Sequence, residues 1–258
     1  MSEIRFDNRV ALITGAGGGL GKTYALELAR RGAKVVVNDL GGAADGTGAS
    51  ASAADAVVAD IERAGGRAVA NHDSVSTPQG GAAMVSAAVA AFGGLDIVIN
   101  NAGILRDKSF VKLEPADLEA VLDVHLRGAF HVSQPAFRVM KEKSYGRFLF
   151  TSSAAGIFGN FGQSNYGAAK MGLVGLSNVL AVEGARANIK SNVIAPIART
   201  RMTEQLLGPL ATALDPEQVT PLVCYLVSEG CNLSHEIFSV GGGRFARGLV
   251  GIAKGWMP

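Results

Sequence analysis

A tyrosine and a lysine four positions apart are the residues in this sequence best suited to move a proton. Tyr166 and Lys170 fall within a helical pattern, so both side chains are expected on one face of that helix. An isolated tyrosine has a pKa of about 10 and is a poor base at neutral pH. A nearby ammonium group stabilises the phenolate and lowers that pKa. The pair could therefore exchange a proton with an alcohol, although the same spacing also occurs on ordinary helix faces.

A serine hydroxyl precedes this pair at a distance that suits the same chemistry. Ser153 follows a short apolar run expected to be a strand, and a glycine-containing loop comes after it. Its hydroxyl could hold a carbonyl or alcohol oxygen. Together, the serine, the tyrosine and the lysine predict acid/base chemistry at a carbon–oxygen bond.

A glycine-rich turn near the N-terminus suits phosphate groups. It reads Thr14-Gly15-Ala16-Gly17-Gly18-Gly19-Leu20-Gly21, between an expected strand and a helix starting near Leu20. Glycines let the backbone approach a pyrophosphate closely, and a helix N-terminus attracts it. The candidate phosphate-binding residues are Gly15, Gly19, Leu20 and Gly21. A flexible loop is the alternative interpretation.

An aspartate after the second expected strand indicates which dinucleotide would bind. Asp39 lies 20 positions after Gly19, where a carboxylate would hold the ribose diol of NAD. Its charge would repel the 2′-phosphate of NADP, and the stretch Ala16–Gly18 contains no basic residue to receive that phosphate. The pattern favours NAD, with a simple turn-capping role as the alternative.

The elements that must position these residues alternate in type along the chain. Apolar runs at 10–13, 35–37, 67–71, 96–99, 148–150, 191–194 and 237–240 predict strands. Helical patterns cover 24–29, 53–64, 80–92, 116–140, 166–187 and 216–227. Strands that are apolar on both faces indicate a parallel sheet with helices on both faces. We expect one doubly wound α/β domain of the Rossmann type over residues 1–258, with seven parallel strands.

Composition excludes several other classes. The chain has 258 residues, 48% of them hydrophobic and 18% charged, with a net charge of +2, which excludes disorder and gives no case for nucleic acid or an anionic membrane. Two cysteines, Cys224 and Cys231, are too few for a disulfide framework. The histidines have no partners at metal-ligand spacing, so no metal site is expected. The polar N-terminus and the absence of a long apolar run predict a cytoplasmic protein.

The order and spacing of these motifs resemble the short-chain dehydrogenase/reductase family from end to end. The matching pieces are the glycine turn, Asn100-Asn101-Ala102-Gly103, Ser153, Tyr166-x3-Lys170 and Asn192-Val193-Ile194-Ala195-Pro196. The resemblance implies a bound nicotinamide cofactor and hydride transfer to or from a carbonyl carbon. It also implies a homodimer or homotetramer formed through the two long helices. The small residues of the Tyr166 helix would suit such close packing.

The resemblance also assigns roles to individual residues. Ser153 would orient the substrate oxygen, Tyr166 would be the acid/base, and Lys170 would lower its pKa and hold the nicotinamide ribose. The other cofactor contacts would come from Asp73, Ser74 and Val75 at the adenine, from Asn100 and Asn101 near the adenine ribose, and from Ala198, Arg199 and Thr200 at the nicotinamide amide and phosphates.

Two positions depart from the common family pattern. Family members often have an asparagine on the long helix that completes a proton relay through water, and His125 occupies that slot here. The imidazole could pass protons in its place or could only fill space. The usual Pro-Gly after the sixth strand is replaced by Pro196-Ile197. The path of the loop beside the nicotinamide is therefore left open.

Within the family, several stretches resemble one branch. It is formed by the (3R)-hydroxyacyl-CoA dehydrogenase domains of peroxisomal multifunctional enzymes of type 2, also classed as 17β-hydroxysteroid dehydrogenases of type 4. The stretches are 35–42, 70–75, 103–110, 125–128 and 156–163. The branch oxidises 3-hydroxyacyl-CoA thioesters with NAD and can act on steroid alcohols, and His125 fits its pattern. The substrate would thus be an acyl-CoA or a steroid, and we expect a free-standing version.

Three other functions are retained as alternatives. The chain could be a 17β-hydroxysteroid dehydrogenase that acts on steroids alone. It could be a 3-ketoacyl carrier-protein reductase using NADPH, against which Asp39 argues. It could also be a non-catalytic protein that senses nucleotides on the same fold. Loss of the serine, the tyrosine or the lysine would mark that class, and all three are present.

Overall fold

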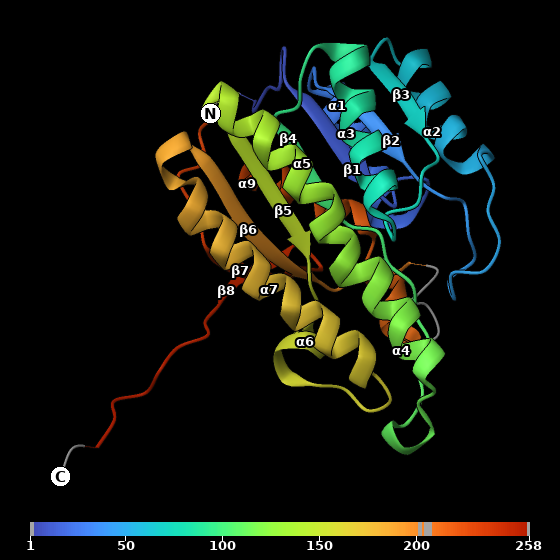
Figure 1. Ribbon diagram of the computed structural model, residues 1–258, viewed down its shortest axis with the longest axis vertical. Helices are drawn as coiled ribbons and strands as arrows, with labels where there is room; N and C mark the ends of the chain where they lie inside the picture. Colours follow the sequence, from blue (N-terminus) through green and yellow to red (C-terminus); the bar gives the residue numbers. More distant parts are fainter. Residues whose placement is uncertain (1–2, 201–202, 204–207, 257–258) are drawn as a thin grey trace.

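The computed structural model describes residues 3–200, 203 and 208–256, and most of them build one sheet with helices on both sides (Figure 1). The strands are β1 (Val10–Thr14), β2 (Lys34–Asn38), β3 (Arg67–Asn71), β4 (Ile97–Asn100), β5 (Gly146–Thr151), β6 (Ile189–Pro196), β7 (Glu236–Gly241) and β8 (Arg244–Gly248). Their order across the sheet is β3-β2-β1-β4-β5-β6-β7-β8. From β1 to β3 the strands are added on one side of β1, and from β4 onwards they are added on its other side. Ligands of such sheets bind at the point of this reversal, between β1 and β4, beyond the carboxyl ends of the strands.

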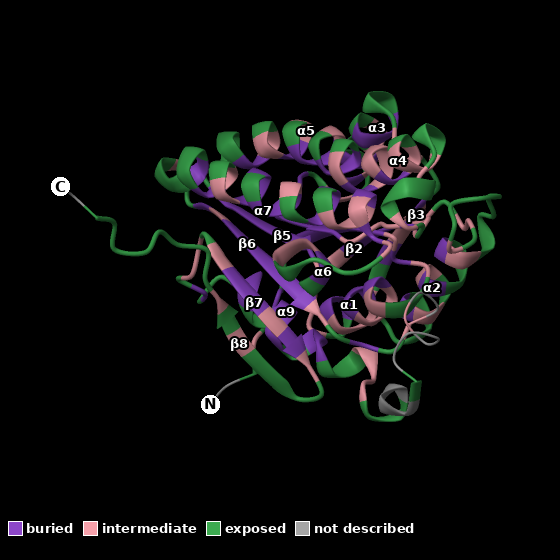
Figure 2. Cartoon of the chain, turned by 90° about the horizontal axis from the view of Figure 1, so that it is seen from below, coloured by how far each residue is buried: buried purple, intermediate pink, exposed green. Residues whose placement is uncertain are grey.

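Helices cover both faces because the central strands are apolar on both sides. Every residue of β1, β4 and β5 is buried. On one face lie α1 (Gly19–Arg30), α2 (Ser52–Arg63) and α9 (Thr220–Leu226), and on the other lie α3 (Pro78–Phe92), α5 (Gly128–Lys143) and α7 (Ser164–Gly184). Figure 2 shows the buried strands between these two layers. The expected doubly wound α/β class is therefore confirmed.

The seven expected parallel strands are present, and the sheet has one strand more than expected. The described part of the chain contains an eighth strand, β8, which pairs with β7 in the antiparallel direction. Gly242 and Gly243 join the two strands with φ angles of +57° and +73°. Two successive residues with positive φ form the tight turn of a β-hairpin.

The single long helix expected at 116–140 is divided. It consists of α4 (Pro115–Leu122), a π-helical turn (Asp123–Arg127) and α5. A π-helical turn inserts one extra residue into a helix and is frequent at functional sites. His125, a candidate catalytic residue, lies in the middle of this turn.

Shorter elements connect the layers. A short helix, α6 (Ala154–Phe158), links β5 to α7. Turns of 3₁₀ helix lie at Phe110–Lys112, Ala185–Ala187, Gly208–Ala213 and Pro216–Gln218. The last of these precedes α9, so the helix expected at 216–227 begins with a 3₁₀ turn. Within the described residues, no helix is long and apolar enough to cross a membrane.

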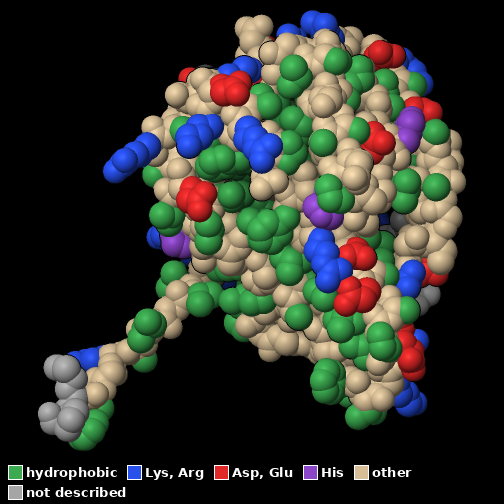
Figure 3. Space-filling model, in the orientation of Figure 1, with side chains coloured by type: hydrophobic (Ala, Val, Ile, Leu, Met, Phe, Trp, Pro, Cys, Tyr) green, Lys and Arg blue, Asp and Glu red, His purple; other side chains and the backbone are tan. Residues whose placement is uncertain are grey.

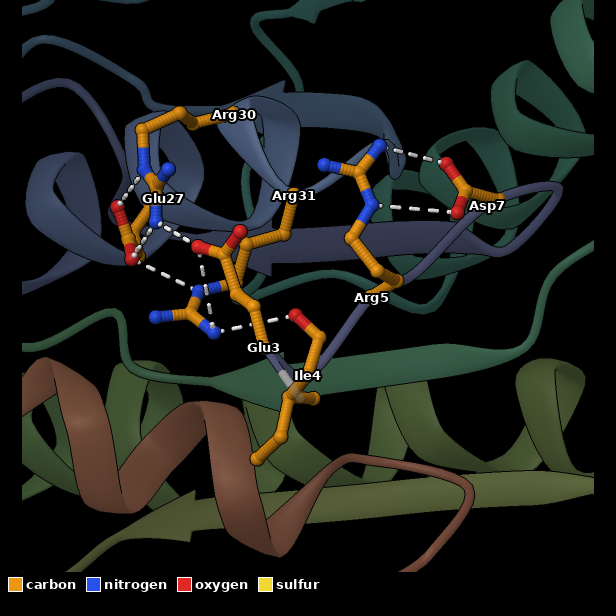
Figure 4. A network of polar contacts seen from close by, with 7 residues as sticks. All are labelled: Glu3, Ile4, Arg5, Asp7, Glu27, Arg30 and Arg31. Atoms are coloured by element: carbon orange, nitrogen blue, oxygen red, sulfur yellow. Dashed lines mark hydrogen bonds and ion pairs between the residues drawn. The ribbon is translucent and has the colours of Figure 1, made fainter. Parts of the chain in front are cut away.

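An ion-pair network fastens the N-terminal segment to the end of α1 (Figure 4). Glu27 accepts hydrogen bonds from Arg30 and Arg31, each at 2.7 Å. Arg30 also reaches Glu3 at 2.5 Å, and Arg31 donates to the Ile4 carbonyl at 3.1 Å. The two arginines hold the pKa of Glu27 down, at about 2. The segment before β1 is thereby held against the helix that follows it.

Candidate active site

The predicted catalytic and cofactor residues meet around one cavity of about 620 Å³ at the carboxyl ends of the strands. Ten of the proposed residues line it: Gly15, Gly19, Leu20, Asp39, Asn101, Ser153, Tyr166, Lys170, Ala198 and Thr200. They come from segments spread over most of the chain. A sheet that is buried on both faces brings them together, because every parallel strand ends at the same edge.

The glycine turn is built so that its backbone faces the cavity. Gly15 has φ of +64°, and a Cβ there would lie 2.8 Å from the Cα of Ala102. A Cβ on Gly21 would lie within van der Waals overlap of the Gly15 carbonyl oxygen. These two glycines therefore allow close packing, whereas Gly18, where a Cβ would meet nothing within 4 Å, borders open space.

The first turn of α1 has amide groups left for a ligand. The helix begins at Gly19 with Gly18 as its N-cap, no side chain caps it, and its first turn contains no acidic residue. Uncapped N–H groups and the positive end of the helix dipole together favour an anion. The turn therefore fits a dinucleotide pyrophosphate, as the sequence predicted.

Asp39 fixes the side of the cavity where an adenosine ribose would lie. Its carboxylate accepts hydrogen bonds from the backbone amides of Gly17 and Gly41, both at 2.7 Å. A Cβ on Gly17 would approach the Asp39 Cγ to 2.8 Å and the Ala53 Cβ to 2.7 Å. The carboxylate is thus held by two backbone amides at the edge of the cavity, close against the glycine turn.

Asn101 braces the turn instead of only lining the cavity. Its Nδ2 donates to the carbonyl oxygens of Thr14 and Gly15, at 3.0 and 3.1 Å. Its backbone amide donates to the Thr14 hydroxyl at 3.0 Å. The neighbouring Asn100 does not line the large cavity, because its side chain points to Ser133, to which Nδ2 donates at 3.0 Å.

The residues predicted to meet the adenine lie outside the lining of the large cavity. Asp73 is exposed at the end of β3, where Asn71 donates to its carboxylate at 2.7 Å. Asn38 donates both to the Asn71 side chain and to the Asp73 carbonyl oxygen, at 2.8 and 2.9 Å. Ser74 accepts a hydrogen bond from the amide of Ser76, and Val75 is buried in the core. This buried amide network holds the end of β3 beside Asp39.

Ser153 is positioned by the short helix that follows it. It is the N-cap of α6, where its hydroxyl oxygen accepts a hydrogen bond from the amide of Ala155 at 3.1 Å. The serine hydroxyl also makes a hydrogen bond with Tyr166. The strand β5 ends two residues earlier, at Thr151, so Ser153 lies on a helix cap rather than on the strand itself.

Tyr166 and Lys170 lie one turn apart on α7, as the spacing predicted. The Lys170 Nζ lies 5.4 Å from the centre of the Tyr166 ring and donates to the Thr151 carbonyl oxygen at 2.6 Å. Burial raises the pKa of Tyr166 to about 12. A hydrogen bond from Ser153 lowers this pKa, but its effect is smaller than that of burial. Burial lowers the pKa of Lys170 to about 7. Both groups are thus desolvated and resist their charged forms, a property typical of catalytic groups.

His125 lies behind the tyrosine rather than in the cavity. Its ring meets the Tyr166 ring edge to face, with centroids 5.2 Å apart. Nε2 lies 2.8 Å from the Ile104 carbonyl oxygen and 3.0 Å from its amide nitrogen. Nδ1 is buried without a hydrogen-bond partner among the described residues. Burial, reinforced by the nearby Lys170, holds the pKa of His125 well below its usual range, so the imidazole is neutral.

A second cavity borders His125 on its other side. It has a volume of about 10 Å³ and is lined also by Asn100, Thr14 and Val75. This volume is close to the minimum for one water molecule. The predicted residues Asn100, Val75 and His125 are therefore grouped at this smaller site and not at the larger one.

The segment after β6 passes the open end of the large cavity. Ile197 donates its amide to the Val240 carbonyl oxygen at 2.7 Å, and a Cβ on Gly241 would collide with the Ile197 carbonyl. The substitution of the usual glycine is thus accommodated by Gly241. Ala198 and Thr200 line the cavity, whereas Arg199 points away to Asp215 at 2.7 Å.

Several lining residues were not predicted from the sequence. They are Leu105, Phe158, Asn160, Gln163, Ile197 and Thr203. Most lie in irregular loops, so no helical or strand periodicity marks them. The stretch 156–163 was noticed only as part of the family resemblance, without a role for its side chains. Among the described residues, no group of histidine, cysteine, aspartate or glutamate side chains is arranged to hold a metal ion.

Comparison with known proteins agrees with this geometry. The family model for short chain dehydrogenases matches residues 9–208. The chain belongs to the short-chain dehydrogenase/reductase family. It is 55% identical over 243 residues to the peroxisomal multifunctional enzyme type 2 of Mus musculus, covering 94% of this chain and 33% of that protein. It is 54% identical over 241 residues to a short-chain type dehydrogenase/reductase of Mycobacterium tuberculosis, covering 93% of this chain and 84% of that protein.

Solved structures show the same fold. A short chain dehydrogenase from Mycobacterium avium superposes with a TM-score of 0.87 at 40% identity, over 98% of this chain and 89% of that one. A 7α-hydroxysteroid dehydrogenase complexed with NADH and 7-oxo glycochenodeoxycholic acid superposes with a TM-score of 0.83 at 30% identity, over 93% of this chain and 95% of that one. The predicted family membership and its oxidoreductase class are therefore confirmed. The chain spans only about a third of the mouse relative.

Proposed function

We propose that this oxidoreductase transfers a hydride between NAD and carbon 3 of a 3-hydroxyacyl-CoA or 3-ketoacyl-CoA. The observation that carries the proposal is the convergence of Ser153, Tyr166 and Lys170 on the cavity that Asp39 and the uncapped start of α1 also line. The likeness to the dehydrogenase part of the mouse multifunctional enzyme supports the acyl-CoA substrate. A relative solved with NADH supports a nicotinamide cofactor.

The residues of this chain fit the cofactor they would hold. The pyrophosphate would lie against the backbone of Gly17–Gly19, and the adenosine ribose would lie against Asp39. Lys170 has further N–H groups besides the one given to Thr151, and these could reach the nicotinamide ribose. The chemistry that NAD would supply when bound is that of a hydride acceptor. The preference for NAD over NADP follows from the carboxylate of Asp39, which would repel a 2′-phosphate.

The mechanism for the chain's own groups follows from their hydrogen bonds. Ser153 would donate its hydroxyl hydrogen to the substrate oxygen, while its oxygen keeps the hydrogen bond from the Ala155 amide. Tyr166 would take the hydroxyl proton during oxidation, for which it must first lose its own proton. Because burial raises its pKa to about 12, the oxidation rate should increase with pH. His125 would act from behind, keeping the Tyr166 ring in place or passing the proton towards the small cavity.

Oligomer formation is also a proposal. The exposed faces of α5 and α7 carry the apolar side chains Phe130, Met171, Val179 and Val182. Hydrophobic atoms gather over these helices in Figure 3. A second copy covering this face would bury them, which supports a homodimer or homotetramer. A cytoplasmic location likewise remains a proposal, since the name of the mouse relative places that protein in the peroxisome.

An assay of substrate and cofactor choice tests the proposed function. The purified protein would be given NAD or NADP with 3-hydroxybutyryl-CoA, longer 3-hydroxyacyl-CoA esters or steroid alcohols, and reduced cofactor would be followed by absorbance. We expect turnover of CoA esters with NAD at least about tenfold above that with NADP. Activity on steroids alone would favour the 17β-hydroxysteroid dehydrogenase alternative. A preference for NADPH and carrier-protein esters would favour the reductase, and cofactor binding without turnover would favour a sensor.

A further inference from the structure

Four large, exposed apolar side chains, one of which lines the catalytic cavity, have no role in the proposed mechanism. Phe110, Val111, Phe158 and Phe161 are 80%, 90%, 84% and 90% exposed. We call these four residues the apolar rim. Figure 3 shows hydrophobic atoms gathered at the lower end of the molecule, around α6 and the loop before α4. Exposed apolar residues that are clustered, rather than scattered singly, mark binding surfaces.

Two loops that are joined to each other carry the rim. The amide of Lys108 donates to the Gly162 carbonyl oxygen at 2.9 Å, in an isolated parallel bridge between Lys108 and Gln163. The Gln163 side chain donates to the Asp107 carboxylate at 2.7 Å. These contacts hold the loop with Phe110 and Val111 against the loop with Phe161. The two segments that carry most of the rim are therefore held side by side.

The rim is continuous with the reacting groups. Phe158 lines the catalytic cavity, and so do Asn160 and Gln163 on either side of Phe161. Ser153 is the N-cap of α6 and Phe158 is its last residue, so the two residues lie at opposite ends of one short helix. Five residues at a rise of about 1.5 Å place the Cα of Phe158 roughly 7.5 Å along that helix from the Cα of Ser153. An extended chain advances about 1.2 Å per bond, so a hydrocarbon reaches this point about six bonds beyond the reacting carbon.

The charges beside the rim are already paired. The Asp117 carboxylate forms ion pairs with Lys108 at 2.7 Å and with Arg106 at 3.6 Å. A phosphate of CoA would have to displace this carboxylate before it could use either cation. The surface therefore suits the hydrocarbon end of a substrate better than its charged end.

We infer that the apolar rim binds the far end of long acyl groups and so determines which acyl chain lengths the enzyme prefers. This inference rests on the proposed function and names the part of its substrate that the rim contacts. Acyl groups of about nine or more carbons reach the phenyl rings, whereas a four-carbon group ends inside the cavity. Removing the rings should therefore lower kcat/KM selectively for substrates with long acyl groups.

The test compares two chain lengths in rim variants. For the unmodified protein and for Phe158→Ala/Phe161→Ala, kcat/KM would be measured with 3-hydroxydodecanoyl-CoA and 3-hydroxybutyryl-CoA. In the double alanine variant, we expect the ratio of kcat/KM for the long ester to kcat/KM for the short ester to fall about tenfold or more. The variant Phe158→Leu/Phe161→Leu restores apolar area and should recover most of the original ratio. The matched control is Phe245→Ala, since Phe245 is 63% exposed on the distant strand β8. A ratio changed less than about twofold overturns the inference.

A binding measurement separates this inference from the proposed function. Calorimetric titration with dodecanoyl-CoA and butyryl-CoA requires no turnover, so its result stands even if no CoA ester is oxidised. Tighter binding of the longer ester, lost in the double alanine variant, supports the rim as an acyl-binding surface. Equal affinity for both esters in the unmodified protein overturns it. A changed molar mass of the double variant in light scattering, with unchanged selectivity, would assign the rim to subunit association instead.

Discussion

The two ends of the sheet bury charged groups in opposite ways. At the amino end of β5, the Arg147 side chain is 1% exposed and donates to the carbonyl oxygens of Gly146, Asn188 and Ser228 at 2.8 to 3.1 Å. At the carboxyl ends, Lys170 is 3% exposed but has one close acceptor, the Thr151 carbonyl, and borders a large cavity. Burial lowers the pKa of both groups, but the lysine reaches about 7, whereas an arginine stays charged.

The difference teaches how to separate structural from functional buried charges. Near the amino ends, Asp96 accepts the Val10 amide at 2.8 Å and has Arg9 and Lys143 within 3.6 Å. Such groups have their hydrogen bonds satisfied inside the protein, so they contribute to stability. Groups at the carboxyl ends keep unused donors and a labile proton. Their desolvation is not compensated within the chain, which suits groups that act on a ligand.

Replacing the acid/base tests the carboxyl-end site most severely. Tyr166→Phe removes the hydroxyl that moves the proton, and we expect kcat to fall about 10³-fold or more, with little change in unfolding free energy. Initial rates and urea unfolding measure the two effects. Tyr225→Phe, on the partly exposed Tyr225 of α9, is the matched control. Full activity in Tyr166→Phe would exclude the assigned mechanism.

Replacing the buried arginine tests the other end. Arg147→Met removes the hydrogen bonds that the guanidinium donates to the carbonyl oxygens of Gly146, Asn188 and Ser228. We expect the unfolding free energy to fall by about 3 kcal/mol, while kcat of the folded enzyme stays within about twofold. Urea unfolding and initial rates test this, with Arg138→Met on the exposed face of α5 as control. A large loss of kcat with unchanged stability would contradict the comparison.

Replacing the lysine should have the opposite effect on stability. The folded-state pKa of Lys170, about 7, lies below that of a free lysine, so folding is disfavoured wherever the unfolded lysine is protonated. This cost is complete below pH 7 and vanishes as the pH rises towards about 10. We expect Lys170→Met to be more stable by about 2 kcal/mol at pH 6 and nearly equal at pH 10, although inactive. Unfolding across this pH range measures it, and a less stable Lys170→Met at pH 6 would contradict it. Lys141→Met is the exposed control.

The surface network of the N-terminal segment should show the smallest effect. The pKa of Glu27 in the folded protein is about 2, below that of a free glutamate, so its stabilising effect is complete above about pH 4.3 and is lost as the pH falls towards 2. Because the pair is solvent-screened, we expect Glu27→Gln to cost about 0.5 to 1 kcal/mol at pH 7 and almost nothing near pH 2. Unfolding at both pH values tests this against Glu183→Gln. A cost that persists near pH 2 would point to packing instead.

The regular parts of the fold could be predicted from sequence because their signals are local. Strands such as Val10–Thr14 are apolar on both faces, and glycines end the helices between them. The position of Tyr166 relative to Lys170 follows from helix geometry alone. Their shared cavity with Ser153 and Asp39 follows from a parallel sheet, whose strands end at one edge.

The remaining features depend on tertiary contacts that no short pattern contains. The π-helical turn at His125 depends on one extra residue in a helix. The hairpin at Gly242 depends on a backbone with positive φ. The joined loops of the rim depend on a hydrogen bond between Lys108 and Gly162, which are far apart in the sequence. Such contacts form only after the layers have packed, so the substrate side of the cavity was less predictable than the cofactor side.

The uncapped start of α1 links the stability of this helix to its ligand. Thr77 caps α3 and Ser153 caps α6, whereas Gly18 offers α1 no side-chain acceptor. The first turn of α1 should therefore open more readily than that of α3, and its amide hydrogens should exchange faster with solvent. A bound pyrophosphate would provide the missing acceptors. Part of the binding energy of the cofactor would then appear as local folding of the helix that receives it.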